Sequence, residues 1–297
     1  MKNEFKRVTG LLVLEVVNSN PNGDPDRESD PRMRDNGRGE ISPVSFKRKL
    51  RDLLEKGNGP VHDSVLEQLR SRVEIPDGYQ FKILESRGRD RKAIQKEMGT
   101  DIKNYDHANY LESAFVKNYW DARLFGNTFL EDGANKEFIK TGIAQFGMGL
   151  SISPVHVVRQ TNTNKAGVQE GKNQGMAPLA YRVVEHGVYL MPFYINPSMA
   201  DKSGCKPCDV ELLKLLIPFA YDHTRSAIRP DVRIRHAWWM EHQNVLGSCP
   251  DFKLIEALSP KRKENALEPS QDWGDYTDVT ELPPDLNGKV TLFDLIG

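Results

Sequence analysis

The most constraining feature of the sequence is an apolar run near its start. The segment VTGLLVLEVV, from Val8 to Val17, is apolar at both odd and even positions. Successive side chains of a strand point to opposite faces, so this run predicts a central strand that is covered on both sides. The chain must therefore place further structure on each face of one sheet. Its 297 residues are enough to do so within one large domain.

The clearest helix signal follows a polar loop. Ser42 is a suitable N-cap, Pro43 suits the first turn, and Gly57 marks the end. One face carries the apolar stripe expected to pack on the sheet, namely Phe46, Leu50, Leu53 and Leu54. The remaining surface is expected to present cations outward, namely Lys47, Arg48 and Arg51.

Further elements follow from hydrophobic periodicity and from the residues that interrupt it. We expect a helix at 61–72, a strand at Tyr79–Ser86 and a helix at Asn109–Gly126. A later helix is expected to bend near Pro218, and KVTLFDLI is expected to add a last strand.

A long hairpin is expected in the second half of the chain. Residues 142–158 alternate between an apolar face, with Phe146, Met148, Leu150 and Ile152, and a small, polar face, with Gln145, Gly147, Gly149, Ser151 and Ser153. A matching strand runs from Tyr181 to Ile195, and the connection between them is polar and rich in glycine. Such a long connection predicts a hairpin at 157–182 that projects from the body, with a tip at Arg159–Ala180.

The order of these elements predicts the fold class. A strand, a basic helix and further strands and helices suggest an α+β protein of the ferredoxin-like, RRM-like kind. We expect residues 1–297 to form one such domain with insertions, and its sheet face is of the kind that holds RNA in other proteins.

Charge is segregated along the chain, although the net charge is only −1. Basic residues gather at 32–56, at 87–92 and at 225–235, whereas the segment from Glu264 to the end carries eight acidic residues and one lysine. Basic surface combined with an acidic segment, at 264–287, fits a polyanion binder that also contacts copies of itself.

Composition argues against secretion and against a membrane partner. No apolar run is long enough for a membrane span, and the N-terminus lacks an apolar signal core. Three cysteines, an odd number, fit a reducing cytosol, so a cytoplasmic protein is expected.

An acidic loop, NSNPNGDPDRESD, raises the question of a metal site. Asp24, Asp26, Glu28 and Asp30 partly match a calcium-binding loop, but Ser29 replaces the glycine of the turn. The pair Cys205 and Cys208 is only half of a zinc site. We therefore expect no metal and no cofactor. The alternative is a metal-dependent ribonuclease that uses Asp24, Asp26 and Asp30; a ribonuclease that relies on histidines also stays open.

Four segments in order resemble one family. NSNPNGDPD after the first strand, SPVSFKRKLRD at the first helix, WDARLFG, and TGIAQFGMGLSISPV before the hairpin are similar to the type I-C form of the Cas-seven family. The match covers essentially the whole chain. The resemblance implies a hand-shaped RRM-like palm with a thumb hairpin, and a non-catalytic subunit of the CRISPR effector complex Cascade. The implied partners are CRISPR RNA, copies of the chain in a helical backbone, other Cascade subunits and target DNA paired with the guide.

The expected RNA contacts combine the basic segments with the hairpin. Phosphates are expected at the helix start and the preceding loop, and close backbone approach at the small residues below the hairpin. The residues are Arg32, Arg34, Ser45, Lys47, Arg48, Arg51, Gln145, Gly147, Gly149, Lys165, Lys172, Met176, Arg233 and Arg235. The last two are expected to share a strand face with Trp239, against RNA or a neighbouring subunit. A third class, an oligomeric scaffold without RNA, stays open.

Overall fold

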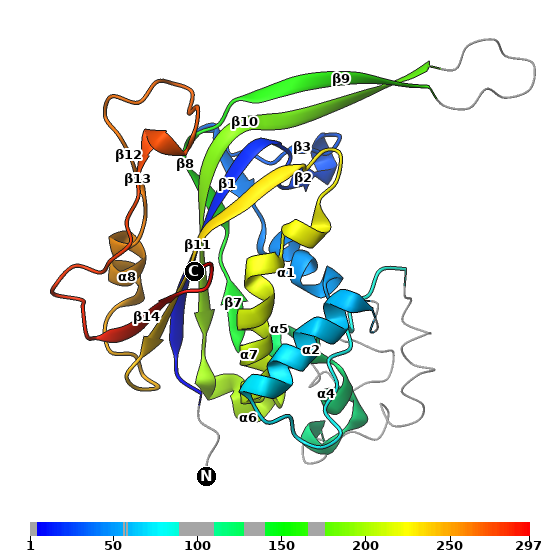
Figure 1. The fold of residues 1–297 in the computed structure, drawn as a ribbon, viewed down its shortest axis with the longest axis vertical. Helices are drawn as coiled ribbons and strands as arrows, with labels where there is room; N and C mark the ends of the chain where they lie inside the picture. Colours follow the sequence, from blue (N-terminus) through cyan, green and yellow to red (C-terminus); the bar gives the residue numbers. More distant parts are fainter. Residues whose placement is uncertain (1–4, 56, 58, 89–109, 128–139, 166–175) are drawn as a thin grey trace, which may run out of the picture.

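An antiparallel sheet of eight strands forms the centre of the molecule (Figure 1). The computed structural model describes residues 5–55, 57, 59–88, 110–127, 140–165 and 176–297. The strand order is β14-β11-β1-β10-β8-β4, and β7 and β9 also pair with β10. The strands are β1 (Val8–Ser19), β4 (Arg38–Ile41), β7 (Ala144–Phe146), β8 (Gly149–Pro154), β9 (Val157–Lys165), β10 (Met176–Ile195), β11 (Asp231–His242) and β14 (Val290–Asp294).

Helices and short strands surround this sheet. Within the described residues the α-helices are α1 (Pro43–Asp52), α2 (Pro60–Arg72), α4 (Ala114–Asn118), α5 (Trp120–Phe125), α6 (Ala200–Ser203), α7 (Pro207–Leu216) and α8 (Asp251–Ala257). The small two-stranded pairs are β2 (Gly23–Asp24) with β3 (Asp30–Pro31), β5 (Gly126–Asn127) with β6 (Lys140–Thr141), and β12 (Lys261–Arg262) with β13 (Tyr276–Thr277). Among the described helices, none has the length and apolar character needed to cross a membrane.

β1 is central and covered on both faces, as its apolar run predicts. It pairs with β10 on one side and with β11 on the other. Leu12 and Leu14 belong to the core beneath α1, α2 and α7, whereas Leu11 and Val13 belong to a second core beneath α8 (Figure 1). The mixed α/β class with a large antiparallel sheet is therefore confirmed.

α1 begins where its sequence predicts. The Ser42 hydroxyl accepts a hydrogen bond from the Ser45 amide at 3.2 Å, and Pro43 occupies the first turn. The helix ends at Asp52, before Gly57, because the Leu54 amide donates to the Arg51 carbonyl in a tighter turn. The bend near Pro218 is also confirmed, since α7 ends at Leu216 and a 3-10 turn follows.

Two expected elements are wrong. Tyr79–Ser86 is not a strand; its one bridge joins Lys82 to Tyr119. The expected helix at Asn109–Gly126 is broken into a 3-10 turn at Tyr110–Glu112, α4 and α5, with Asn109 itself outside the described residues. The break has a local cause, because Ser113 caps α4 and Tyr119 is extended to reach Lys82.

The alternation expected around β8 is reversed. Gly149, Ser151 and Ser153 are buried, whereas Leu150 and Ile152 are only partly buried. Two bulky residues of β10, Tyr189 and Met191, fill the core beside this strand, so only small side chains fit there.

The β9–β10 hairpin extends away from the rest of the molecule (Figure 1). The two strands pair residue by residue, from Val157 opposite Val184 to Lys165 opposite Met176. β10 is long enough to cross the sheet and continue into the arm, so the hairpin is a direct extension of a core strand.

Candidate nucleic-acid interface

Lys47 carries an unneutralised charge on α1. Within the described residues it has no carboxylate at ion-pair distance, and its Nζ lies 5.1 Å from the centre of the Phe125 ring. Burial lowers the pKa of the Lys47 ammonium, the charge of Arg51 lowers it further, and Glu85 opposes both. An anion close to Lys47 would stabilise the charged ammonium and raise its pKa again.

Arg48 is already paired. Its Nε lies 2.7 Å from Asp52 Oδ1, one turn along the helix, and its Nη2 lies 3.0 Å from Glu55 Oε2. These carboxylates balance the guanidinium charge, so Arg48 offers less attraction to a phosphate than Lys47 does.

Arg51 does not lie on the outer surface, which corrects the expectation from helix periodicity. Its side chain is buried, with Nε 2.8 Å from Asp121 Oδ2 and Nη2 3.0 Å from Glu85 Oε2. Asp121 in turn accepts the Leu84 amide at 2.7 Å. The pairing partner comes from α5, which lies 70 residues further along the chain and is invisible to local patterning.

The loop before α1 holds the next two predicted residues. The Arg32 amide donates to the Asn22 carbonyl, and the Arg32 carbonyl accepts from the Glu40 amide, both at 2.9 Å. The backbone is thereby fixed, while the Arg32 side chain has no carboxylate partner among the described residues. Arg34 differs, since its Nε lies 2.6 Å from Glu40 Oε1.

The acidic loop is attached to the hairpin. Asp30 forms an ion pair with Arg182 of β10, and Asp24 accepts the Asp26 amide at 3.2 Å as a local cap. Within the part of the chain that the structure describes, no three His, Cys, Asp or Glu side chains converge as metal ligands. The carboxylates needed by the ribonuclease alternative therefore do not gather in one place.

The hairpin base adds cations that sequence reasoning missed. Arg159 and Arg182 are directly opposite each other on β9 and β10. With Arg27 they line a hollow of about 240 Å³. Like charges directly opposite across a strand pair destabilise it, and Asp30 offsets one of them. Two arginines that face each other across a hairpin therefore indicate anion binding. The sequence shows this only when the register of the hairpin is known.

The small residues below the hairpin face protein. A Cβ on Gly147 would lie 2.9 Å from Pro192 Cγ, and a Cβ on buried Gly149 would lie 3.0 Å from Met191 Cε. The exposed Gln145 donates to the Gly142 carbonyl at 3.1 Å. These contacts give the two glycines a packing role that is independent of RNA.

This geometry predicts a folding defect for Gly147→Val. The added side chain meets the rigid Pro192 ring, so we expect the free energy of unfolding to fall by about 1–3 kcal/mol. Gln145→Val, at an exposed position of the same segment, should change it by less than about 0.5 kcal/mol. Urea unfolding of both variants measures the difference. Equal stability of Gly147→Val and the unaltered protein would contradict the packing role.

Arg233 and Arg235 surround one buried carboxylate. Glu15 of β1 is 2% exposed, and its Oε2 lies 3.3 Å from Arg233 Nη1 and 2.8 Å from Arg235 Nη2. The expected shared face with Trp239 is wrong. A register shift between β1 and β11 inserts an extra residue near Arg235, so Trp239 packs in the core on the opposite face.

The remaining predicted residues belong to the hairpin tip. The backbones of Lys165 and Met176 are paired with each other at the last described rung. Lys172 lies outside the described residues.

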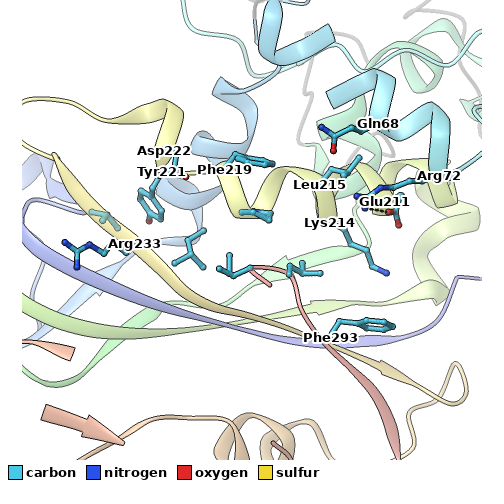
Figure 2. Close-up of a pocket in the computed structure, with 15 residues that line it drawn as sticks. Gln68, Arg72, Glu211, Lys214, Leu215, Phe219, Tyr221, Asp222, Arg233 and Phe293 are labelled. Atoms are coloured by element: carbon cyan, nitrogen blue, oxygen red, sulfur yellow. Dashed lines mark hydrogen bonds and ion pairs between the residues drawn. The ribbon is translucent and has the colours of Figure 1, made fainter. Parts of the chain in front are cut away.

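A separate groove of about 650 Å³ lies between α2, α7 and β14 (Figure 2). Its wall includes the exposed rings of Phe219 and Phe293. Its cations are neutralised, because Arg72 pairs with Glu211 at 3.2 Å and Lys214 pairs with Glu241 at 2.8 Å. The groove therefore differs from the surroundings of Lys47, whose charge has no carboxylate partner among the described residues.

Sheet, helix and hairpin together define a mixed α/β protein with an unneutralised basic surface. We define this surface by four of the described cations that lack a carboxylate partner, namely Arg27, Arg32, Lys47 and Arg159. The chain belongs to the CRISPR-associated protein Cas7 family, whose model matches residues 6–281.

Solved structures similar to this chain are distant. One described as a CRISPR RNA-guided surveillance complex, pre-nicking, has 13% identity and a TM-score of 0.46, covering 79% of this chain and 78% of that one. A second CRISPR RNA-guided surveillance complex has 12% identity and a TM-score of 0.45, covering 88% and 78%. A type III-B Cmr-beta complex bound to cognate target RNA has 10% identity and a TM-score of 0.41, covering 80% and 61%. The comparison with curated proteins finds no match.

Proposed function

We propose that this chain is a non-catalytic, CRISPR RNA-binding backbone subunit of a type I-C Cascade complex in the cytoplasm. Several copies stack along one guide RNA without regard to its sequence, alongside other Cascade subunits, and support recognition of target DNA in antiviral defence. The proposal combines membership of the Cas7 family with the sequence motifs that resemble the type I-C form.

The unneutralised basic surface is the observation that carries this proposal. Its cations lie on α1, on the loop before β4 and at the hairpin base, and those of the loop and α1 are held by a fixed backbone. Isolated cations without carboxylate partners suit phosphates, which every RNA sequence presents equally. A subunit that must accept any part of a variable guide requires this kind of contact.

The ribonuclease alternative is less well supported. Asp30 is paired with Arg182, and no three metal-ligating side chains converge within the described residues. The subunit is therefore proposed to bind RNA without cleaving it. Incubation of labelled RNA with the purified protein, with and without added magnesium and manganese, tests this directly. Cleavage that a chelator abolishes would reject the non-catalytic role.

Removal of the charge at Lys47 should reduce the salt dependence of RNA binding. For Lys47→Gln we expect the slope of log K against log salt to fall by about one unit, because one phosphate contact is lost. Arg48→Gln should change it less, since Asp52 and Glu55 already balance that guanidinium. Lys202→Gln on α6, at the end of the molecule away from the hairpin, is the matched control (Figure 1). An unchanged slope for Lys47→Gln would contradict the assignment.

A further inference from the structure

β14 forms an open edge of the central sheet. It pairs with β11 on one side, and no strand that the structure describes pairs with its other side. The Leu295 amide donates to the Ala237 carbonyl at 3.0 Å, which extends the same register beyond Asp294. Alternate residues of an antiparallel strand bond to the same neighbour, so the N–H and C=O groups of Leu292 and Asp294 point away from β11. Within the described residues these four groups have no hydrogen-bond partner.

The opposite edge of the sheet is closed by the chain itself. Beside β4, the Glu40 amide donates to the Arg32 carbonyl at 2.9 Å, and the next bond along joins the Arg34 amide to the Arg38 carbonyl. Proteins usually protect an exposed edge with lysine, proline, a bulge or a covering segment. The five residues of β14 include no lysine or proline, and no register shift interrupts their pairing with β11. The carboxylate of Asp294 is turned back towards β11, where it accepts a backbone amide at 3.0 Å.

The groove of about 650 Å³ lies at this same edge (Figure 2). The sheet forms its floor, with Phe293 of β14 and Ile234 of β11, and residues of α2 and α7 form the facing wall. Phe293 is opposite Trp239 in the sheet, and the Lys214 ammonium of α7 lies 5.5 Å from the centre of the Phe293 ring. Phe293 therefore faces the helices. A strand added beside β14 would continue the floor and direct every second side chain towards the helix layer.

The chemistry of the groove suits large apolar side chains. Phe219, Phe293 and Ile296 line it and are 39%, 43% and 38% exposed. Its lining cations already have carboxylate partners, so a phosphate would gain little there. The volume lies within the range of about 300–1,000 Å³ that is usual for ligand pockets. An extended apolar peptide therefore fits this groove better than RNA does.

We propose that the groove and the open edge of β14 together bind an extended segment of a partner protein, which joins the sheet as a further strand. The backbone of the segment pairs with Leu292 and Asp294, and large apolar side chains at every second position pack against Phe219 and Phe293. Two copies of β14 would instead pair about a two-fold axis, which closes after two copies. Copies that stack along one guide run head to tail. The choice of a partner over a second copy thus rests on the proposed function, whereas the site rests on the edge and the groove.

Selection of peptides from a random nine-residue library against the intact protein tests the proposal. We expect the selected peptides to carry large apolar residues at alternate positions. Methylation of every second backbone amide of such a peptide should weaken binding about tenfold, because those amides face β14, and methylation of the intervening amides should not. Fluorescence anisotropy of the labelled peptides measures the affinity.

Two variants of the protein supply the matching arms. Leu292→Pro removes a backbone donor that faces solvent, a position where edge strands tolerate proline, and should weaken peptide binding about tenfold. Phe219→Ser removes an apolar anchor without changing β14 and should have a similar effect. Phe252→Ser, at a 57% exposed position on α8, is the matched control and should bind the peptides like the unaltered protein. If Leu292→Pro does not fold, Phe219→Ser and the methylated peptides decide the question.

Several results would overturn the proposal. These are a library that yields no binding peptide, selected peptides without apolar alternation, and equal binding to Phe219→Ser and the unaltered protein. A dimer of the unaltered protein that Leu292→Pro dissociates, measured by light scattering, would make a second copy the occupant. Loss of RNA affinity in Phe219→Ser would assign the groove to RNA. Failure of the unaltered protein to bind RNA would defeat the proposed function, while the peptide measurements would still decide on the groove.

Discussion

A variant that lacks residues 162–176 should fold and bind short RNA but should not form regular multi-copy assemblies on a long guide. Among the described strands, β9 pairs only with β10, and the deletion leaves the rungs from Val157 opposite Val184 to Thr161 opposite Ala180. The buried hairpin residues Val183 and Val184 lie at the base and are kept. The deletion removes the outer rungs of the arm, from Asn162 opposite Leu179 to Lys165 opposite Met176, and the proposed function assigns contacts between copies to this hairpin.

Electron microscopy and size-exclusion chromatography on a long RNA measure assembly, while thermal unfolding measures the fold. A glycine–serine replacement of 162–176 with the same length is the matched control, because it separates the length of the arm from its side chains. Regular assemblies formed by the deletion variant would refute the proposed role of the hairpin in stacking. Loss of folding in the variant would show instead that the arm is part of the core.

Arg123→Leu should destabilise the fold more than any surface substitution. Arg123 and Asp209 are both fully buried, with Nη2 2.7 Å from Oδ1. Burial opposes the charge on Arg123, yet Asp209 outweighs it and raises the pKa of the guanidinium. Nη1 donates to the carbonyls of Val116 and Lys117, and Nη2 also donates to the carbonyl of Gln80. Leucine would leave a buried carboxylate and three carbonyls without this donor.

The free energy of unfolding should therefore fall by about 3–5 kcal/mol, as expected when one partner of a buried pair is removed. Guanidinium unfolding measures the loss. Arg225→Ala removes an exposed pair with Asp222 and should cost less than about 1 kcal/mol. If Arg123→Leu does not fold, the double variant Arg123→Met, Asp209→Leu should recover stability, since it leaves no unpaired charge. A loss as small as that of Arg225→Ala would contradict the structural role of the pair.

Local sequence signals predicted much of the fold because their causes lie within a few residues. The two-sided apolar run of β1, the Ser42 cap of α1 and the break of α7 at Pro218 each depend on neighbours along the chain. The helix at Asn109–Gly126 failed because Tyr119 bridges to Lys82, a contact across 37 residues. The reversed burial along β8 also has a cause distant in sequence. The bulky residues that leave room only for small side chains belong to β10.

The candidate site likewise has features that follow from local sequence and features that depend on tertiary contacts. Sequence alone determined that cations gather on α1 and its preceding loop and that a long hairpin follows, since composition and periodicity are local properties. Only the tertiary structure decided which charges are free. Asp121 neutralises the charge of Arg51, and Glu15 neutralises that of Arg235. Lys47 and Lys49 have no carboxylate partner among the described residues. Electrostatic pairing acts through space over a few ångströms, and residues far apart in the chain supply the partners.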